Sequence, residues 1–427
     1  MKRISWLGLV YLMGVFTVFV QADEVQDLRE QLQNQYKAMQ EIQNRLIALE
    51  ARQKQQDEQI KAFQNKECFQ IPETLKWAEK IKFYGDFRFR GEWHQGENNQ
   101  VTQSDQTRGR IRFRLGMDVM INDEFDVHAR LATGSSDDPT STNQTLGEDW
   151  VKKDFWLDRA YLDWHPKAVE GVHVLAGKMG MPFQVVNDLI WDSDVNPEGA
   201  ALQYSWKPAD KWEVFSSVGG FWVEENSTTT DIGMWGMQGG TKYAFNKEEY
   251  LLGGVTYYDY TSIKNKKING ARGGNSATKV GADYFYDYDY NLVELFGEYG
   301  LKVFDLPSAI QGQYVNNVAS GVSADTGWLL GLRLNKAKKA GTWQFTYDYR
   351  EAQRNSVLGA FAETDFIDGG VGGRGHRFGY RYQFTDSIYG GVYYYMSERA
   401  RSVTTYGASD KADDDYRKIR AEMVISF

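Results

Sequence analysis

Between Ile81 and Phe427, segment after segment of the sequence alternates polar and apolar residues with a period of two, and this alternation restricts the possible folds more than any other feature. Near its start, Phe87 and Phe89 fall on one side of the pattern and Arg88 and Arg90 on the other. Successive side chains of a β-strand point to opposite faces of a sheet, so the pattern predicts strands with one charged face. Long strands of this kind fit a barrel with an apolar face toward lipid and a polar interior.

Sixteen candidate strands follow from the alternation, an even number, as in single-chain bacterial outer-membrane barrels. They are residues 81–94, 107–121, 125–134, 154–165, 171–180, 199–206, 212–223, 233–245, 249–260, 278–286, 291–304, 327–335, 341–351, 374–384, 387–397 and 416–427. Short connections with turn-forming residues alternate with long ones, among them 181–198, 305–326 and 352–373. This alternation is expected when both termini lie in the periplasm. We therefore predict an all-β transmembrane barrel of about 16 antiparallel strands over residues 81–427.

The N-terminus has the pattern of an export signal. Lys2 and Arg3 precede an apolar stretch that runs to Val20, and the small residue Ala22 stands before the polar Asp23. A basic head, an apolar middle and small residues at a polar boundary predict a signal peptide over residues 1–22. The alternative is a retained membrane anchor.

Residues 23–65 carry a heptad pattern. Alternate steps of three and four residues land on Val25, Leu28, Leu32, Gln35, Met39, Ile42, Leu46, Leu49, Gln53, Gln56, Ile60 and Phe63. The positions between them are mostly charged or Gln, and no Pro or Gly interrupts the pattern. This narrow apolar seam predicts an α-helical coiled coil that precedes the barrel and self-associates in the periplasm. Residues 66–80, with Cys68, then form a linker.

Composition and motif searches exclude several other classes. The chain has 58 acidic and 49 basic side chains, so a nucleic-acid partner is not expected, because binding phosphate requires a basic surface. One cysteine rules out a disulfide-stapled module. The five histidines have no metal-ligand spacing, and no Gly-x-Ser-x-Gly turn occurs, so we expect no enzyme, no metal and no cofactor. The polar loop at 135–153 is either a divalent-ion site or a solvated turn-forming segment.

The C-terminal residue provides a further signal. The chain ends on Phe427 after outward-facing apolar residues, and this ending resembles the signal by which the barrel-assembly machinery recognises outer-membrane proteins. The resemblance implies the assembly machinery as a partner and outer-membrane lipid as the surroundings of the barrel.

Three segments carry a closer resemblance to a known family. They are Lys82–Arg90, Arg130–Gly134 running on to Asp138–Gly147, and Trp191–Asp194. With the signal peptide, the coiled coil and the terminal Phe, they resemble the "putative porin" family of Gram-negative outer-membrane proteins. The resemblance implies a passive channel for ions and small hydrophilic solutes, and analogy with porins together with the heptads implies a homotrimer. A weaker similarity to phosphate-selective porins leaves an anion-selective channel open.

Two sets of charged residues are candidates for the channel interior. Arginines gather on one face of the first three strands: Arg88, Arg90, Arg108, Arg110, Arg112, Arg114 and Arg130. Carboxylates gather on the long loop after the fifth strand: Asp188, Asp192, Asp194 and Glu198. In general porins the third external loop folds into the barrel, and by that analogy these acids face the arginines. A transverse field of this kind favours small hydrophilic solutes over apolar ones.

Two other interpretations remain open. The arginines could pair with Asp86, Glu92 and Asp118 inside a plugged barrel. The protein would then be a structural or tethering barrel, with the coiled coil attached to peptidoglycan and little or no transport.

Overall fold

The structure is a computed structural model, and it describes residues 29–30, 33–34, 36–54, 73–96, 103–269, 273–399 and 414–427. The chain divides into two units, Met1–Lys76 and Trp77–Phe427. The predicted signal peptide, residues 1–22, lies outside the described residues. Among the residues that are described, no helix is both long enough and apolar enough to cross a membrane.

The described parts of residues 29–54 are helical, and their side chains are exposed. A coiled coil needs a second helix, and only one chain is present, so the predicted pairing of this helix remains a prediction. Part of the predicted linker at 66–80 is also ordered, because Glu73–Lys80 form the 3₁₀ helix η1 directly before the first strand.

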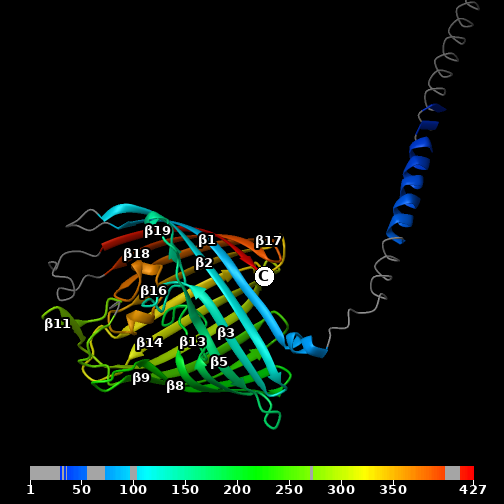
Figure 1. The fold of residues 1–427 in the computed structure, drawn as a ribbon. Coiled ribbons are helices and arrows are strands. Elements are labelled where there is room, and N and C mark those ends of the chain that lie inside the picture. Colours follow the sequence, from blue (N-terminus) through cyan, green and yellow to red (C-terminus); the bar gives the residue numbers. More distant parts are fainter. Residues whose placement is uncertain are drawn as a thin grey trace, which may run out of the picture. The chain divides into compact units, whose positions relative to one another are not determined.

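Sixteen strands within the described residues form the barrel wall (Figure 1). They are β1 (Ile81–Gly96), β2 (Gln103–Asn122), β3 (Phe125–Thr133), β5 (Phe155–Trp164), β6 (Val172–Lys178), β7 (Glu198–Ala209), β8 (Trp212–Glu224), β9 (Ile232–Ala244), β10 (Tyr250–Thr261), β13 (Tyr290–Val303), β14 (Leu306–Asn317), β15 (Thr326–Leu334), β16 (Trp343–Ala352), β17 (Gly373–Thr385), β18 (Ile388–Arg399) and β19 (Asp414–Ser426). Each is antiparallel to its neighbours, and the predicted number of strands is confirmed.

The barrel closes where the first strand meets the last. β1 pairs with β2 on one side and with β19 on the other. The terminal residue extends this seam, because Phe427 N donates to Gly85 O at 3.0 Å and Gly85 N donates to Phe427 O at 2.9 Å. Closure leaves no exposed sheet edge, which is a requirement for strands that cross lipid.

Two of the predicted assignments are wrong, one of a strand and one of a loop. Residues 278–286, predicted as a wall strand, form the separate hairpin of β11 (Ala277–Val280) and β12 (Asp283–Tyr286). The predicted loop at 305–326 contains β14, which pairs with β13 and β15. The turn before β14 consists of Phe304 and Asp305, both in the left-handed region with φ of 51° and 62°. Such turns usually carry Asn or Asp followed by Gly, and Phe304-Asp305 lacks that order, so the turn was missed. The two errors cancelled in the number of strands.

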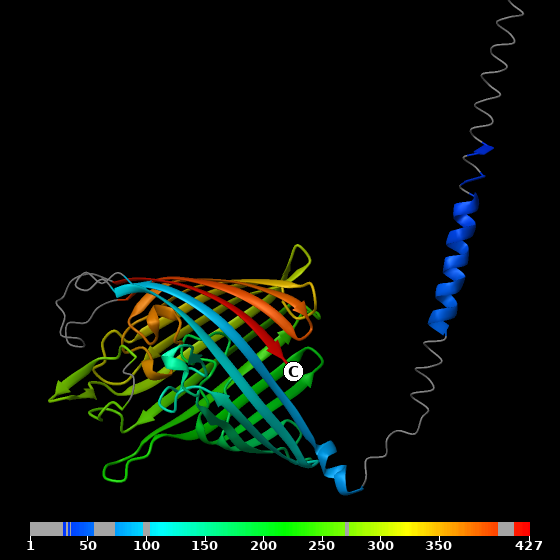
Figure 2. The ribbon, with the colours of Figure 1, turned by 45° about the horizontal axis from the view of Figure 1, so that its top comes forward.

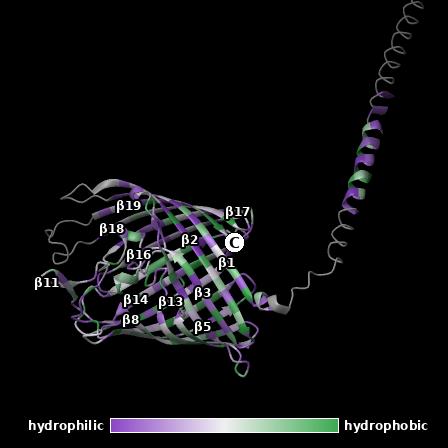
Figure 3. Ribbon diagram, in the orientation of Figure 1, coloured by the Kyte–Doolittle hydropathy of each residue, from purple (hydrophilic) through white to green (hydrophobic). Residues whose placement is uncertain are grey.

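Hydrophilic and hydrophobic residues alternate along the strands of the wall (Figure 3), and the exposed fractions of the side chains show that the apolar ones face outward. Phe89 and Leu330 are outward-facing and about half exposed, at 51% and 52%. The inward-facing Arg90 and Thr256 are buried, at 4% and 0%. This is the reverse of a water-soluble protein, and it suits a barrel whose outer surface contacts hydrocarbon.

The longest connections all lie at one end of the barrel, as predicted, but not every connection there is long. The connections at the other end are 123–124, 165–171, 210–211, 245–249, 304–305, 335–342 and 386–387. The described connections at the long-loop end are 134–154 (L2), 179–197 (L3), 225–231, 262–289 (L5), 318–325 and 353–372 (L7). L2 contains β4 (Gln144–Thr145) and η2 (Glu148–Trp150), and L7 contains η3 (Gly359–Phe361) and η4 (Phe366–Asp368).

The apolar core of the barrel lies inside it, between the loops and the wall. Phe183 and Trp191 of L3 pack edge-on against the inward-facing Tyr258 of β10, with ring centroids 5.2 and 5.4 Å apart. Trp191 also contacts Phe361 of L7, at 5.9 Å. Figure 2 shows the short helices of L7, coloured orange, between the walls at the long-loop end. L3 and L7 therefore occupy the interior together.

Candidate functional site

Arginines from two adjacent strands form one face of the interior. On β1 and β2, Arg88 lies opposite Arg112, and Arg90 lies opposite Arg110. All of these side chains point inward because their positions alternate with outward-facing apolar residues. β19 adds Lys418 and Arg420 on the other side of β1, where they lie opposite His94 and Glu92. We call the inward-facing cations of β19, β1 and β2 the basic wall: Arg88, Arg90, Arg108, Arg110, Arg112, Arg114, Lys418 and Arg420.

Carboxylates within the strands neutralise part of the basic wall. Asp86 accepts from Arg112 Nε at 2.9 Å and from Arg114 Nε at 2.7 Å. Glu92 accepts from Arg108 Nε at 2.6 Å. These contacts relieve the repulsion between like charges directly opposite each other. The plugged-barrel interpretation predicted that Asp86, Glu92 and Asp118 pair with the arginines. Asp86 and Glu92 do so, whereas Asp118 contacts His128 Nδ1 at 2.7 Å.

The seventh predicted arginine extends the basic side of the interior to the neighbouring strands. Arg130 on β3 is buried and forms an ion pair with Asp158 on β5. Asp158 also accepts from Asn196 Nδ2 at 2.9 Å, and Asn196 belongs to L3. Arg130 is therefore linked through one carboxylate to the loop that enters the barrel.

Asp194 is the L3 acid that faces the basic wall. Its Oδ1 lies 3.4 Å from Arg114 Nη1, and its Oδ2 accepts from Thr142 N and Oγ1 of L2 at 3.2 and 2.9 Å. Burial opposes ionisation, but Arg112 and Arg114 outweigh it and hold the pKa of Asp194 below its usual range. L2 also reaches the wall directly, since Arg88 Nη2 donates to Asn143 Oδ1 at 2.6 Å.

Asp188 lies against a different part of the interior. It accepts from Arg350 Nη2 on β16 at 2.6 Å and from Arg377 Nη1 on β17 at 2.6 Å. Asp348 shares the same two arginines, at 2.8 and 2.6 Å. Burial opposes ionisation of Asp188, but the two guanidinium groups prevail and hold its pKa below the usual range. This cluster anchors L3 to β16 and β17.

The other two predicted acids do not face arginines. Asp192 is buried and accepts from the backbone N of Asp194 at 2.8 Å and of Thr364 at 3.3 Å. Burial, and then the neighbouring Asp194, raise the pKa of Asp192 well above its usual value. Glu198 begins β7, is exposed, and pairs with Lys178 Nζ at 2.6 Å.

L7 supplies interior acids that the sequence analysis did not select. Asp365 forms ion pairs with Lys418 and Arg420 of the basic wall, and Glu363 is buried beside it. Arg377 and Arg381 lie four residues apart and so share one face of a strand, and this spacing was the available signal for further interior cations. No local signal marks Asp365, because L7 reads as an ordinary polar, glycine-rich loop.

The side of the interior across from the basic wall mixes amides with a few charges, among them the buried Glu294 and the ion pair between Glu298 and Arg333. Gln238 of β9 accepts from Gln184 N of L3 at 2.6 Å, and Gln311 of β14 donates to Val186 O at 2.8 Å. L3 thus binds an amide-lined surface through its backbone while its carboxylates Asp188 and Asp194 reach arginines. Among the described residues, no group of three or more His, Cys, Asp or Glu side chains could hold a metal ion.

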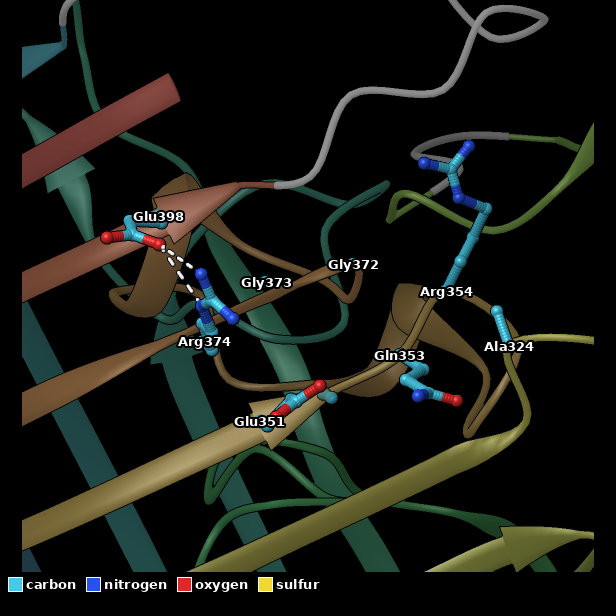
Figure 4. A pocket seen from close by; sticks show the side chains of 9 residues that line it. Ala324, Glu351, Gln353, Arg354, Gly372, Gly373, Arg374 and Glu398 are labelled. Carbon is cyan, nitrogen blue, oxygen red and sulfur yellow. Dashed lines mark hydrogen bonds and ion pairs between the residues drawn. The ribbon is translucent and has the colours of Figure 1, made fainter. Parts of the chain in front are cut away.

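A small pocket of about 320 Å³ lies at the long-loop end, outside the basic wall (Figure 4). Its charged lining includes Glu351, Arg374 and Glu398, and Figure 4 shows the ion pair from Arg374 to Glu398. These residues alternate with the inward-facing Arg350 and so belong to the outer face of the sheet. The pocket is separate from the charged interior.

A closed sixteen-stranded barrel with a charged interior and an inserted third loop defines a porin-like protein. Residues 94–284 and 279–409 match the family described as "Putative porin", and the chain belongs to this family. The resemblance seen in the sequence is thereby confirmed.

A solved structure shares the fold. OprB of Pseudomonas putida, determined at high pH, is 12% identical, with 83% of this chain and 96% of that chain covered and a TM-score of 0.53. A triple mutant of Rhodopseudomonas blastica porin is 10% identical over 81% of this chain and 100% of that one, with a TM-score of 0.43, which is too low to support an argument. A search of curated proteins finds no match.

Proposed function

We propose that the protein is a passive diffusion channel of the outer membrane for ions and small hydrophilic solutes. The proposal is carried by the basic wall, which faces an inserted loop inside a barrel with an apolar exterior. Fixed charges lining a narrow aqueous path attract small polar solutes and penalise apolar ones. Membership of the porin family supports the same conclusion.

We further propose that the channel prefers anions. Eight cations make up the basic wall, and only three strand carboxylates, Asp86, Glu92 and Glu422, lie among them. The loop acids Asp194 and Asp365 reduce the excess without removing it. An anion passing along this wall therefore meets a net positive potential.

The test is single-channel recording of the purified full chain in a planar bilayer, with the reversal potential measured under a KCl gradient. We expect stable conductance steps and a reversal potential with the sign that a chloride-selective channel gives. Arg112→Gln should shift this potential toward potassium because it removes one charge from the basic wall. Arg417→Gln is the matched control, since it removes the same charge from the exposed outer face of β19.

A second candidate function is a structural barrel that tethers the outer membrane. It is favoured by the filling of the interior, where L2, L3 and L7 all bind arginines of the basic wall. A folded protein that gives no conductance steps in the same bilayer would establish this alternative and end the channel proposal.

The remaining proposals concern location and assembly. We propose a signal peptide at residues 1–22 and a coiled coil at 23–65 in the periplasm, with peptidoglycan as a partner. The barrel itself would assemble as a homotrimer through the barrel-assembly machinery, with Phe427 as its signal. Native mass spectrometry that finds only monomer would contradict the trimer.

A further inference from the structure

The tip of L7 places a carboxylate at the centre of a cation cluster. Asp365 Oδ1 lies 2.6 Å from Lys418 Nζ, and Asp365 Oδ2 lies 3.4 Å from Arg90 Nη1 and also contacts Arg420 Nη1. Asp365 is 5% exposed and Lys418 is 1% exposed. Three cations from the adjacent strands β1 and β19 thus converge on one carboxylate that belongs to a loop. We call Arg90, Lys418 and Arg420 the carboxylate station.

The carboxylate station has more donor capacity than the chain satisfies. Arg90 Nε and Arg420 Nε are buried and have no hydrogen-bond acceptor among the described residues. Two wall acids lie nearby: Glu422 is 3.3 Å from Arg90 Nη2, and Glu92 is 3.6 Å from Lys418 Nζ. Without Asp365, three cations would face these two acids, and further cations such as Arg108 lie beside Glu92. Buried guanidinium groups with spare donors favour an additional anion.

The chain that carries Asp365 has a strained, glycine-rich backbone, and its neighbours Phe366 and Ile367 are buried against Tyr395. Ile367 and Asp368 follow it with φ of 49° and 60°, a left-handed backbone that is unfavourable for a β-branched residue. Gly369 and Gly370 come next, with φ of 93° and 86°, and Gly372 and Gly373 complete a glycine-rich run. Backbone strain of this kind clusters at ligand clamps and switch regions.

We propose that the carboxylate station binds the carboxylate of an anionic solute in transit, and that Asp365 is an internal occupant which such a solute displaces. The proposal rests on the channel function proposed above. The ligand class is a small mono- or dicarboxylate, because the present occupant is a carboxylate that contacts Lys418 with one oxygen and two arginines with the other. Displacement releases the L7 tip from the basic wall.

The proposal is tested by measuring how succinate blocks the KCl current through the full chain, as the succinate concentration that halves the current. Uncharged succinamide is the ligand control. In Asp365→Asn the internal competitor is lost, so the succinate concentration for half-block should fall at least about tenfold, which corresponds to about 1.4 kcal/mol. Succinamide should not block either protein. Asp368→Asn is the matched control: the same charge change in the same loop, at a residue that contacts Tyr416 Oη at 3.5 Å. It should leave the half-block concentration unchanged.

Each outcome separates the two proposals. Conducting channels with equal half-block concentrations in wild type and Asp365→Asn overturn the carboxylate station and leave the channel function standing. Folded proteins that never conduct overturn the channel function itself. Should Asp365→Asn not fold, as checked by circular dichroism, Lys418→Gln in the otherwise unchanged chain decides. That variant should raise the half-block concentration at least about tenfold, and an unchanged value overturns the proposal.

Discussion

Replacing Asp188 by Asn should detach one anchor of L3 and destabilise the barrel. Asp188 is the carboxylate between Arg350 and Arg377, and the Arg350 side chain is only 3% exposed. Breaking a buried ion pair by removing one partner costs 3–5 kcal/mol, and since the Asp188 side chain is 26% exposed we expect the lower limit, about 3 kcal/mol. The remaining anion, Asp348, cannot neutralise both arginines.

Unfolding by guanidinium chloride in lipid vesicles measures this loss. The denaturant concentration at the midpoint should fall, while the slope of the unfolding free energy against denaturant stays unchanged. In planar bilayers, the same variant should give larger or noisier conductance steps because L3 is held less firmly inside the barrel. Glu198→Gln is the control in the same region. Its ion pair with Lys178 is exposed, at 60% and 33%, and such pairs contribute about 1 kcal/mol or less. Equal midpoints for the two variants would refute the view that Asp188 anchors L3.

Two further predictions concern pH and closure. Burial, and then the nearby Asp365 and Asp188, raise the pKa of Glu363 to about 7. Glu363 is therefore neutral below that pH and gains a negative charge as the pH rises through it, so the reversal potential should move toward potassium between pH 6 and 8; a Glu363→Gln variant that retains the same step would show that another group is responsible. Gly85→Ala should prevent closure of the barrel, because an added Cβ would lie 2.4 Å from Arg114 O and 2.6 Å from the Phe427 ring. Folding measured by circular dichroism and protease resistance should be lost, and a normally folded variant would contradict the tight fit.

The order of residues along each strand made the barrel predictable. Side chains two residues apart share a face whatever the tertiary context, so Arg88 and Arg90 on one face and Phe87 and Phe89 on the other already implied a polar interior and an apolar exterior. The same rule predicted an arginine face on β2. The prediction failed at the turn before β14, because Phe304 adopts a left-handed backbone conformation that an aromatic residue rarely signals.

The partners of those charges depended on the tertiary structure alone. Sequence analysis placed Asp188 opposite the arginines of the first strands, but the loop runs to Arg350 and Arg377, 162 and 189 positions away along the chain. Likewise, closure of β1 on β19 brings Arg90 next to Lys418 and Arg420, and L7 then places Asp365 among them. Local periodicity sets which way a side chain points, whereas the path of a loop depends on all the surfaces it meets. The sequence therefore determined the barrel and the inward-facing arginines of β1 and β2. Closure of the barrel added Lys418 and Arg420 to them, and only the packing of L3 and L7 inside the closed barrel decided which acids meet which arginines.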